Sequence, residues 1–511
     1  MADAKRLAKN TLYMYARMIL IMLVSIYTSR VVLDKLGVDD YGLYNAVASI
    51  VAMIVFLNTT LSTSTSRFLT YDLGQGDAKK LRNTFSTSFY THVMLAFFIV
   101  LVMETIGLWY MTHKFVIPDG RETATFWIYH ISTLTTVIAV LQVPFTASIM
   151  AHENMDVYAY VGIFEVVSKL AILYLLMIAP IDSLIFYALL VAGVQLVVTL
   201  LYVVISRYKY PETHLVRHFS KETFRGMMGF TGWTAVANLS NTVIVQGATV
   251  LLNLFFAPSI IAAKALANQI TNAVMQFVNN FRVALNPQII KSYASGEIEE
   301  FKRWSLRSTV ITSDLMLVIG LPCVVSMKAI LGIWLVEVPP LAVEFTQLAI
   351  ISQIIHSISA STYIPFVASG KLKWNAIWGV VISVAYFVAM YVVFRLGGGA
   401  LWVQWLYIVV AFVSVFILRP VLLHKEVDFS YKEIYRCIWD CFKPILVAGI
   451  VAWGLSRVFD ESMWQQVTLF LLVFLETLLF IWLLLDRSIK NYIIVMVKSR
   501  MVMHNNKNNY V

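Results

Sequence analysis

The sequence predicts an all-α integral membrane protein, and three observations carry this prediction. Of the 511 residues, 59% are hydrophobic and 13% are charged, against about 45–50% and about 25% in soluble domains. Apolar runs of membrane-spanning length recur along the whole chain. Lysine and arginine gather between alternate runs. Because so few charges cannot cover the surface of soluble domains, the composition excludes a soluble enzyme, a disordered chain, a fibrous repeat and a disulfide scaffold.

Fourteen apolar runs are long enough to cross a bilayer, and within a membrane each must be a helix to satisfy its backbone. The runs cover residues 10–33, 41–66, 86–111, 125–148, 157–180, 183–206, 226–255, 259–286, 305–328, 341–366, 374–395, 401–423, 442–458 and 464–486. With both termini placed in the cytoplasm, the inner loops carry most of the 39 lysines and arginines, which is the charge bias expected of a membrane protein. In the inner segment 424–441, apolar residues recur at helical spacing. This segment is either an amphipathic helix on the inner leaflet or a solvated loop.

Short motifs repeat along the chain at nearly one spacing, which indicates an internal duplication. Pro144-Phe145 and Asn154 recur as Pro365-Phe366 and Asn375. Likewise, the turns Gly76-Asp77 and Gly296-Glu297, and the pairs Ala46/Ala48 and Ala265/Ala267, repeat at offsets of about 220 residues. We therefore expect two six-helix lobes, residues 1–220 and 221–440, that enclose a cleft near the bilayer midplane. Residues 441–511 hold two further spans and a cytoplasmic tail.

Charged side chains inside the predicted spans are costly and usually face a partner or a cavity. The acidic ones are Glu104, Glu165 and Asp314, and the basic ones are Arg17, Arg30, Lys169, Lys264 and Arg282. Glu165 and Lys169 stand four residues apart, so they share one helix face and can form a structural pair. With Asp314 they are also the candidates for ion coupling.

The span at 259–286 carries a polar stripe at three- and four-residue steps. Lys264 and Arg282 are 18 residues apart, about five turns, so they share the face that amide side chains fill between them. Such a stripe either joins helices or lines a wet cavity. We predict a cavity that binds an amphiphilic anion with a hydroxyl-rich head, because arginine and lysine suit phosphate and amides suit sugars. The predicted substrate-binding residues are Arg17, Arg30, Lys264, Asn268, Asn272, Gln276 and Arg282.

Several kinds of chemistry leave no signal in the sequence. There is no phosphate-binding P-loop and no cluster of metal ligands at suitable spacing. No basic face is interleaved with stacking aromatics, and the three cysteines read as free thiols. We therefore expect no cofactor, no metal and no nucleic-acid partner.

Leu36-Gly37 and Tyr41-Gly42-Leu43-Tyr44-Asn45, with the arginine-bearing first span and the Gly76-Asp77 turn, resemble bacterial polysaccharide-transporter proteins. These are O-antigen-type flippases of lipid-linked oligosaccharides, in the multidrug/oligosaccharidyl-lipid/polysaccharide exporter superfamily. The resemblance implies a V-shaped fold in the bacterial inner membrane. It also implies alternating access that carries undecaprenyl-diphosphate-linked oligosaccharide outward for lipopolysaccharide, capsule or exopolysaccharide assembly, with membrane lipids and a glycan polymerase as partners. Cations at the depth of Arg17, Arg30, Lys264 and Arg282 bind the diphosphate or the sugars in such proteins.

Three alternatives remain open. A flippase for a lipid-linked peptidoglycan precursor would also have fourteen spans, and a multidrug/ion antiporter belongs to the same superfamily. A membrane glycan polymerase or ligase would need a sizeable outer loop to hold catalytic groups. The longest predicted outer loop, residues 112–124, is short, so we expect a transporter and not an enzyme.

Overall fold

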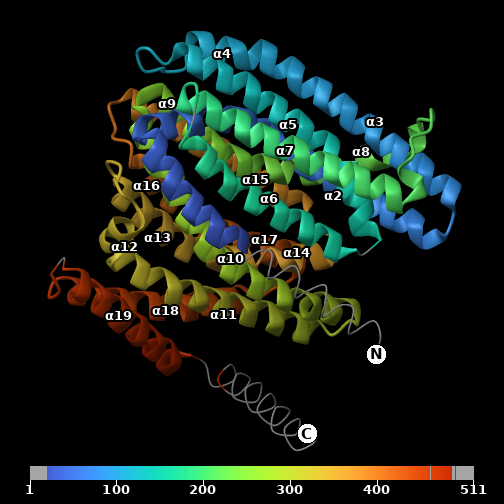
Figure 1. The fold of residues 1–511 in the computed structure, drawn as a ribbon. Coiled ribbons are helices and arrows are strands. Elements are labelled where there is room, and N and C mark those ends of the chain that lie inside the picture. Colours follow the sequence, from blue (N-terminus) through green and yellow to red (C-terminus); the bar gives the residue numbers. More distant parts are fainter. Residues whose placement is uncertain (1–19, 153, 179, 461, 486–489, 491–511) are drawn as a thin grey trace, which may run out of the picture. The chain divides into compact units, whose positions relative to one another are not determined.

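All regular structure in the described part of the chain is helical (Figure 1). The computed structural model describes residues 20–152, 154–178, 180–460, 462–485 and 490. This confirms the predicted all-α class. The described residues form two compact units. The first contains residues 20–266, 335–342 and 376–403, and the second contains residues 267–334, 343–375 and most of the chain from 404 onward.

Eleven helical segments are long and apolar enough to cross a membrane, so the chain is a multi-pass membrane protein. They are α2 (Val38–Gln75), α3–η1–α4 (Ala78–Val102, Met103–Gly107, Leu108–His113), α5 (Glu122–Ala151), α6 (Met155–Leu176), α7 (Ser183–Lys209), α11 (Ile298–Val325), α13–α14 (Ala342–Ser361, Ile364–Ser369), α15 (Lys373–Arg395), α16–η4–α17 (Trp402–Val413, Ser414–Leu418, Arg419–Val427), α18 (Tyr431–Ser456) and α19 (Met463–Leu484).

The other three predicted spans are also helical where they are described. They correspond to residues 20–36, to α8–η3–α9 (Lys221–Thr242, Val243–Gly247, Ala248–Phe255) and to α10 (Pro258–Ala294). These segments are not among the eleven that meet the length and hydropathy limits. The total of fourteen spans therefore stays a prediction, although the described part of every predicted span is mostly helical.

The starts of the helices repeat along the chain as the sequence motifs do. The helices α2, α3 and α5 begin at residues 38, 78 and 122, and α10, α11 and α13 begin at 258, 298 and 342. Each start recurs 220 residues later. Gly76 and Gly296 both adopt left-handed backbone angles, with φ of 74° and 76°, which glycine reaches without strain. The duplicated motif therefore marks a duplicated turn, whereas the division into lobes at residues 220 and 440 stays a prediction.

In the first unit, α2 packs against α3, α5 and α8. Gly42, near the start of α2, lies so close to Pro258 that a Cβ atom there would collide with the Pro258 carbonyl oxygen. Only glycine allows this approach of two backbones. The contact gives a physical reason for the glycine in the Tyr41-Gly42-Leu43 motif.

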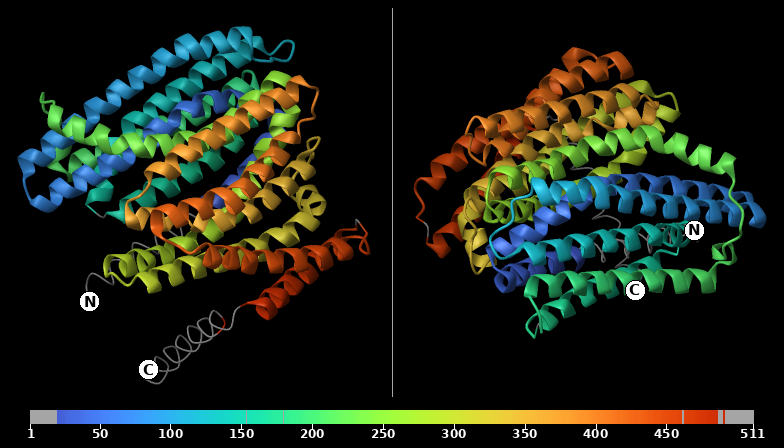
Figure 2. Two further views of the ribbon diagram at one scale, coloured as in Figure 1. Left: turned by 180° about the vertical axis from the view of Figure 1, so that it is seen from behind. Right: turned by 90° about the horizontal axis from the view of Figure 1, so that it is seen from above.

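In the second unit, α11 packs along α18 and α19 (Figure 2). The prediction of a separate surface helix or a loop at 424–441 is wrong. Residues 424–427 end α17, and Ser430 and Glu433 form a capping box that starts α18, which runs without a break to Ser456. The apolar side of the predicted amphipathic segment is buried, including Ile434 and Ile438, because it packs in the protein instead of on lipid.

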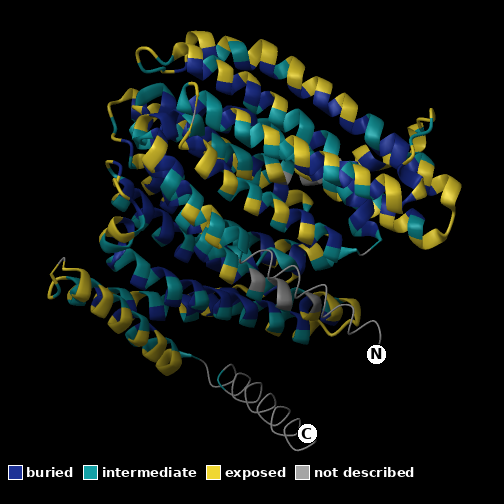
Figure 3. Cartoon of the chain, in the orientation of Figure 1, coloured by how far each residue is buried: buried dark blue, intermediate teal, exposed yellow. Residues whose placement is uncertain are grey.

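The outer helices expose large apolar side chains, and Figure 3 marks much of α19 as exposed. On α19, Leu471, Leu475, Leu479 and Leu483 recur every four residues and are each more than half exposed. Val473, on the opposite side, is buried. A helix that is apolar all round requires an apolar environment on both sides, so this exposed face fits contact with lipid.

Candidate functional site

Of the two predicted binding arginines near the N-terminus, the structure describes one. Arg17 lies outside the described residues. Arg30 lies on the helix of residues 20–36 and is partly buried. The role of both residues in substrate binding stays a prediction.

Lys264 is buried in the first unit, with 3% of its surface exposed. Its Nζ atom donates hydrogen bonds to the Val245 carbonyl oxygen at 3.2 Å and to Thr249 Oγ1 at 2.9 Å. Val245 belongs to η3, a single turn of π-helix, and such wide turns are frequent at functional sites. The ammonium group is therefore bonded inside the first unit and does not lie open on a wet wall as predicted.

The predicted polar stripe lies on one uninterrupted helix, α10. Asn272 is exposed, while Asn268, Gln276 and Arg282 are partly buried. Because α10 is continuous, Lys264 and Arg282 stand about 27 Å apart along it. Among the described residues, Arg282 forms no ion pair. It thus presents an uncompensated positive charge in the second unit.

Arg419, at the start of α17, is a second such cation, and it lies within the predicted span 401–423 but not among the predicted site residues. Its Nη1 atom donates to Asn375 Oδ1 at 2.5 Å, and its guanidinium lies 5.7 Å from the centre of the Phe366 ring. Its Nε atom is buried and has no hydrogen-bond partner in the described part of the chain. The sequence does contain one pointer to this site. Asn375, which binds Arg419, is the repeat of Asn154 in the internal duplication.

Arg282, Arg419 and His356 form what we call the cationic cluster of the second unit. The charges of both arginines act on His356, from α10 and from α17. The His356 ring stacks on the Tyr407 ring, with centroids 6.3 Å apart. No carboxylate pairs with either arginine within the described residues, so the cluster is strongly electropositive and suits an anion.

A small cavity adjoins this cluster in the second unit. Arg419 lines it together with the hydroxyl-bearing residues Thr309, Ser359 and Thr362. The remaining lining residues are apolar, except for the thiol of Cys437. An arginine and three hydroxyl groups at one cavity can donate and accept hydrogen bonds, as recognition of a polar head group requires.

The candidates for ion coupling are Glu165, Lys169 and Asp314. Two of them form an ion pair, and the third is a buried acid. Lys169 Nζ lies 2.6 Å from Glu165 Oε1 on α6, which confirms the predicted pair. Both of these side chains are partly exposed. Asp314 on α11 is 7% exposed, and its Oδ1 atom has no hydrogen-bond partner among the described residues. The pair is neutral by itself, whereas Asp314 is an isolated buried acid.

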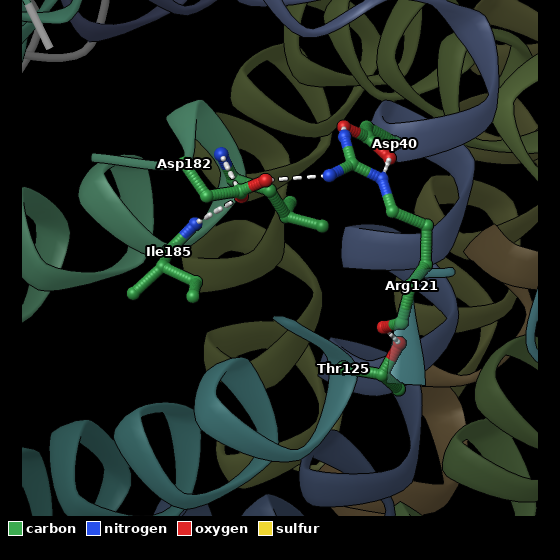
Figure 4. Close-up of polar contacts among 6 residues, drawn as sticks. Asp40, Arg121, Thr125, Asp182 and Ile185 are labelled. Carbon is green, nitrogen blue, oxygen red and sulfur yellow. Dashed lines mark hydrogen bonds and ion pairs between the residues drawn. The ribbon is translucent and has the colours of Figure 1, made fainter. Parts of the chain in front are cut away.

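A cluster that the sequence analysis missed centres on Arg121, just before α5 (Figure 4). Its guanidinium binds both carboxylate oxygens of Asp40 on α2 and, at 2.5 Å, Asp182 Oδ2 before α7. The Asp182 Oδ1 atom also accepts from the backbone nitrogen of Leu184 and so caps α7. Two acids balance the charge of Arg121, and their three hydrogen bonds with its guanidinium tie three helices together.

Three solved structures are similar in fold to the chain. The lipid II flippase MurJ, in an inward closed conformation, matches with a TM-score of 0.69 at 11% identity, over 93% of this chain and 98% of that one. An inward-facing multidrug resistance MATE family transporter of the MOP superfamily matches with a TM-score of 0.60 at 14% identity, over 79% of this chain and 97% of that one.

A third match is a MOP superfamily transporter from Pyrococcus furiosus, with a TM-score of 0.56 at 13% identity, over 81% of this chain and 95% of that one. No protein-family model and no curated protein sequence matches the chain. The fold of the chain is therefore the one shared by MurJ and the MATE transporters of the MOP superfamily.

Proposed function

We propose that the protein is a flippase that moves undecaprenyl-diphosphate-linked oligosaccharide units across the bacterial inner membrane. The observation that carries this proposal is the cationic cluster, in which Arg282 and Arg419 have no carboxylate partner among the described residues. A protein that transports cations would place acids there instead. A diphosphate supplies the missing negative charge.

The groups around the cluster suit the rest of such a substrate. Guanidinium groups bind phosphate oxygens through paired hydrogen bonds. Asn375 and the hydroxyl groups of Thr309 and Ser359 can bond sugar hydroxyls. The polyprenyl tail can stay in lipid while the head group crosses. Transport then needs no bond to be made or broken, so the protein acts as a transporter and not as an enzyme.

In this proposal both termini face the cytoplasm and the sugar is released on the outer side, where a glycan polymerase extends the surface polysaccharide. We further propose that Arg17, Arg30 and Lys264, with the amides of α10, contact the head group as it moves. The alternating access that such movement requires is the mechanism proposed for duplicated transporters of this kind.

A second candidate is a flippase for a lipid-linked peptidoglycan precursor. Its support is the match to MurJ, which covers 93% of the chain, against 79% for the MATE transporter. Both substrates carry a polyprenyl diphosphate, so the cationic cluster serves either. A multidrug antiporter has weaker support, because the cluster would repel cationic drugs.

Reconstitution of the full chain into proteoliposomes tests the proposal. Three substrates are compared: an undecaprenyl-diphosphate oligosaccharide, a peptidoglycan precursor lipid and a cationic dye. We expect flipping of the oligosaccharide lipid, measured by its accessibility to an impermeant lectin. The variants Arg282→Ala, Lys264→Ala and Arg17→Ala should flip about tenfold less or lower, since a charged hydrogen bond contributes about 1.5–3 kcal/mol. Movement of the precursor lipid alone would establish the second candidate, and movement of the dye alone would refute both.

A further inference from the structure

The last two helices, α18 and α19, lie beyond the duplicated part of the chain and pack against α11 in the second unit. Beyond their first turns, these three helices carry one carboxylate each: Asp314 on α11, Asp440 on α18 and Glu476 on α19. The cationic cluster does not account for any of them.

Asp314 and Asp440 meet at a small cavity between the three helices. The cavity is lined by both carboxylates and by apolar residues, including Val310 from α11, Pro444 from α18 and Ile481 from α19. Asp314 is more than nine-tenths buried, and its Oδ1 atom has no hydrogen-bond partner in the described part of the chain. The cavity beside this residue has room for about one water molecule.

Glu476 lies on α19, between the start of that helix and the residues of α19 that line the cavity. Ser326 Oγ, at the end of α11, donates to the Gln466 carbonyl oxygen on α19, while Asp314 lies at the level of Ile481. The two helices are therefore antiparallel, and Glu476 lies about 7.5 Å along α19 from Ile481. Both carboxylate oxygens of Glu476 are buried without a hydrogen-bond partner among the described residues.

Lys443 on α18 and Lys490 after α19 both have partners. On α18, Lys443 Nζ pairs with Asp440 at 2.6 Å. After α19, Lys490 Nζ donates to the Leu483 carbonyl oxygen at 3.2 Å. Besides Asp440, the titratable group that interacts with Asp314 is the thiol of Cys441 on α18. A buried carboxylate without a counter-charge is far more costly than the neutral acid.

We propose that Asp314 and Glu476 each bind a proton within the packing of α11, α18 and α19, Asp314 at the small cavity with Asp440 at its entrance, and Glu476 apart from that cavity along α19. The proton of Asp314 enters from the side of Asp440 and Lys443, where the acid is partly exposed and paired. On Asp314 and on Glu476, the neutral acid needs no partner. A further step, which rests on the proposed flippase function, is that loading and release of these protons supply the energy for translocation.

A hydrophobic carbodiimide tests the site itself, because it modifies carboxyl groups that hold a proton in apolar surroundings. In the full chain at about pH 7, mass spectrometry should show adducts on Asp314 and Glu476 at least about tenfold above Glu165, since one pKa unit is a tenfold change in protonation. Glu165 is the matched control because Lys169 pairs with it in a spanning helix. Adducts on Asp314 and Glu476 no more abundant than on Glu165 would overturn the proposal.

Transport in proteoliposomes tests the coupling. An imposed pH gradient should accelerate flipping by the intact protein, and Asp314→Asn and Glu476→Gln should each remove most of that acceleration while Glu165→Gln keeps it. A gradient response that survives in both variants, or a response to sodium alone, would overturn the coupling. If the intact protein flips no glycan lipid but the adducts form, the proposed function fails and the proton site stands.

Discussion

Arg121 and Arg419 are arginines in opposite chemical settings, one in each compact unit. Arg121 binds two carboxylates that also hold α2 and α7, so its charge is more than balanced (Figure 4). Arg419 binds one neutral amide and the face of an aromatic ring, and its Nε atom is left without a partner among the described residues. The first arginine joins helices, and the second keeps a charge and a donor for a ligand.

The comparison shows that an arginine side chain does not reveal its role by itself. Its partners decide whether it stabilises the fold or binds something from outside. Lys264 lies between the two cases, because its bonds go to a carbonyl and a hydroxyl that do not cancel its charge.

Replacing Arg419 should give the largest effect. In Arg419→Ala, flipping of a diphosphate-linked glycan should fall by about tenfold to a hundredfold, since charged hydrogen bonds contribute about 1.5–3 kcal/mol each. Arg419→Lys should recover part of the activity because it restores the charge but not the paired donors. The measurement is flipping in proteoliposomes, with equal amounts of inserted protein. Full activity in Arg419→Ala would remove the contrast between the two arginines.

Replacing Arg121 should affect stability more than transport. In Arg121→Ala, the buried carboxylate of Asp40 loses its partner, which should cost about 1.5–3 kcal/mol and lower the apparent melting temperature in detergent. The double variant Arg121→Ala with Asp40→Asn should regain stability because the buried charge is gone. If the double variant is less stable than the single one, the pairing of Arg121 with Asp40 is not what stabilises this end of the unit.

A cysteine-accessibility experiment has the smallest effect on the protein but locates the two arginines relative to the membrane. Gly120→Cys, next to Arg121, should react with an impermeant thiol reagent applied outside intact spheroplasts. Lys221→Cys, in the predicted inner loop, should react only after permeabilisation. Reversed labelling would invert the topology and place Arg419 near the outer side.

The sequence predicted well whatever depends on local pattern. The predicted span 183–206 is α7 (Ser183–Lys209), and the spacing of Glu165 and Lys169 predicted their ion pair. It failed where the partner is distant in the chain, since Arg121 is 81 residues from Asp40 and 61 from Asp182. The segment 424–441 was misread for the same reason. The sequence shows the helical spacing of its apolar residues, but it does not show that they pack against α11.

The three π-helical turns in the described residues interrupt α-helices at η1, η3 and η4. Such a turn accommodates one residue more than a regular helix would, so deleting one residue inside η3 should restore the regular winding and leave the two flanking faces aligned. The same deletion one turn away in α9 would rotate everything beyond it by about 100°. The wide turns are therefore places where a length change is absorbed. Of the three, η3 contains Val245, the acceptor of Lys264, and η4 lies directly before Arg419.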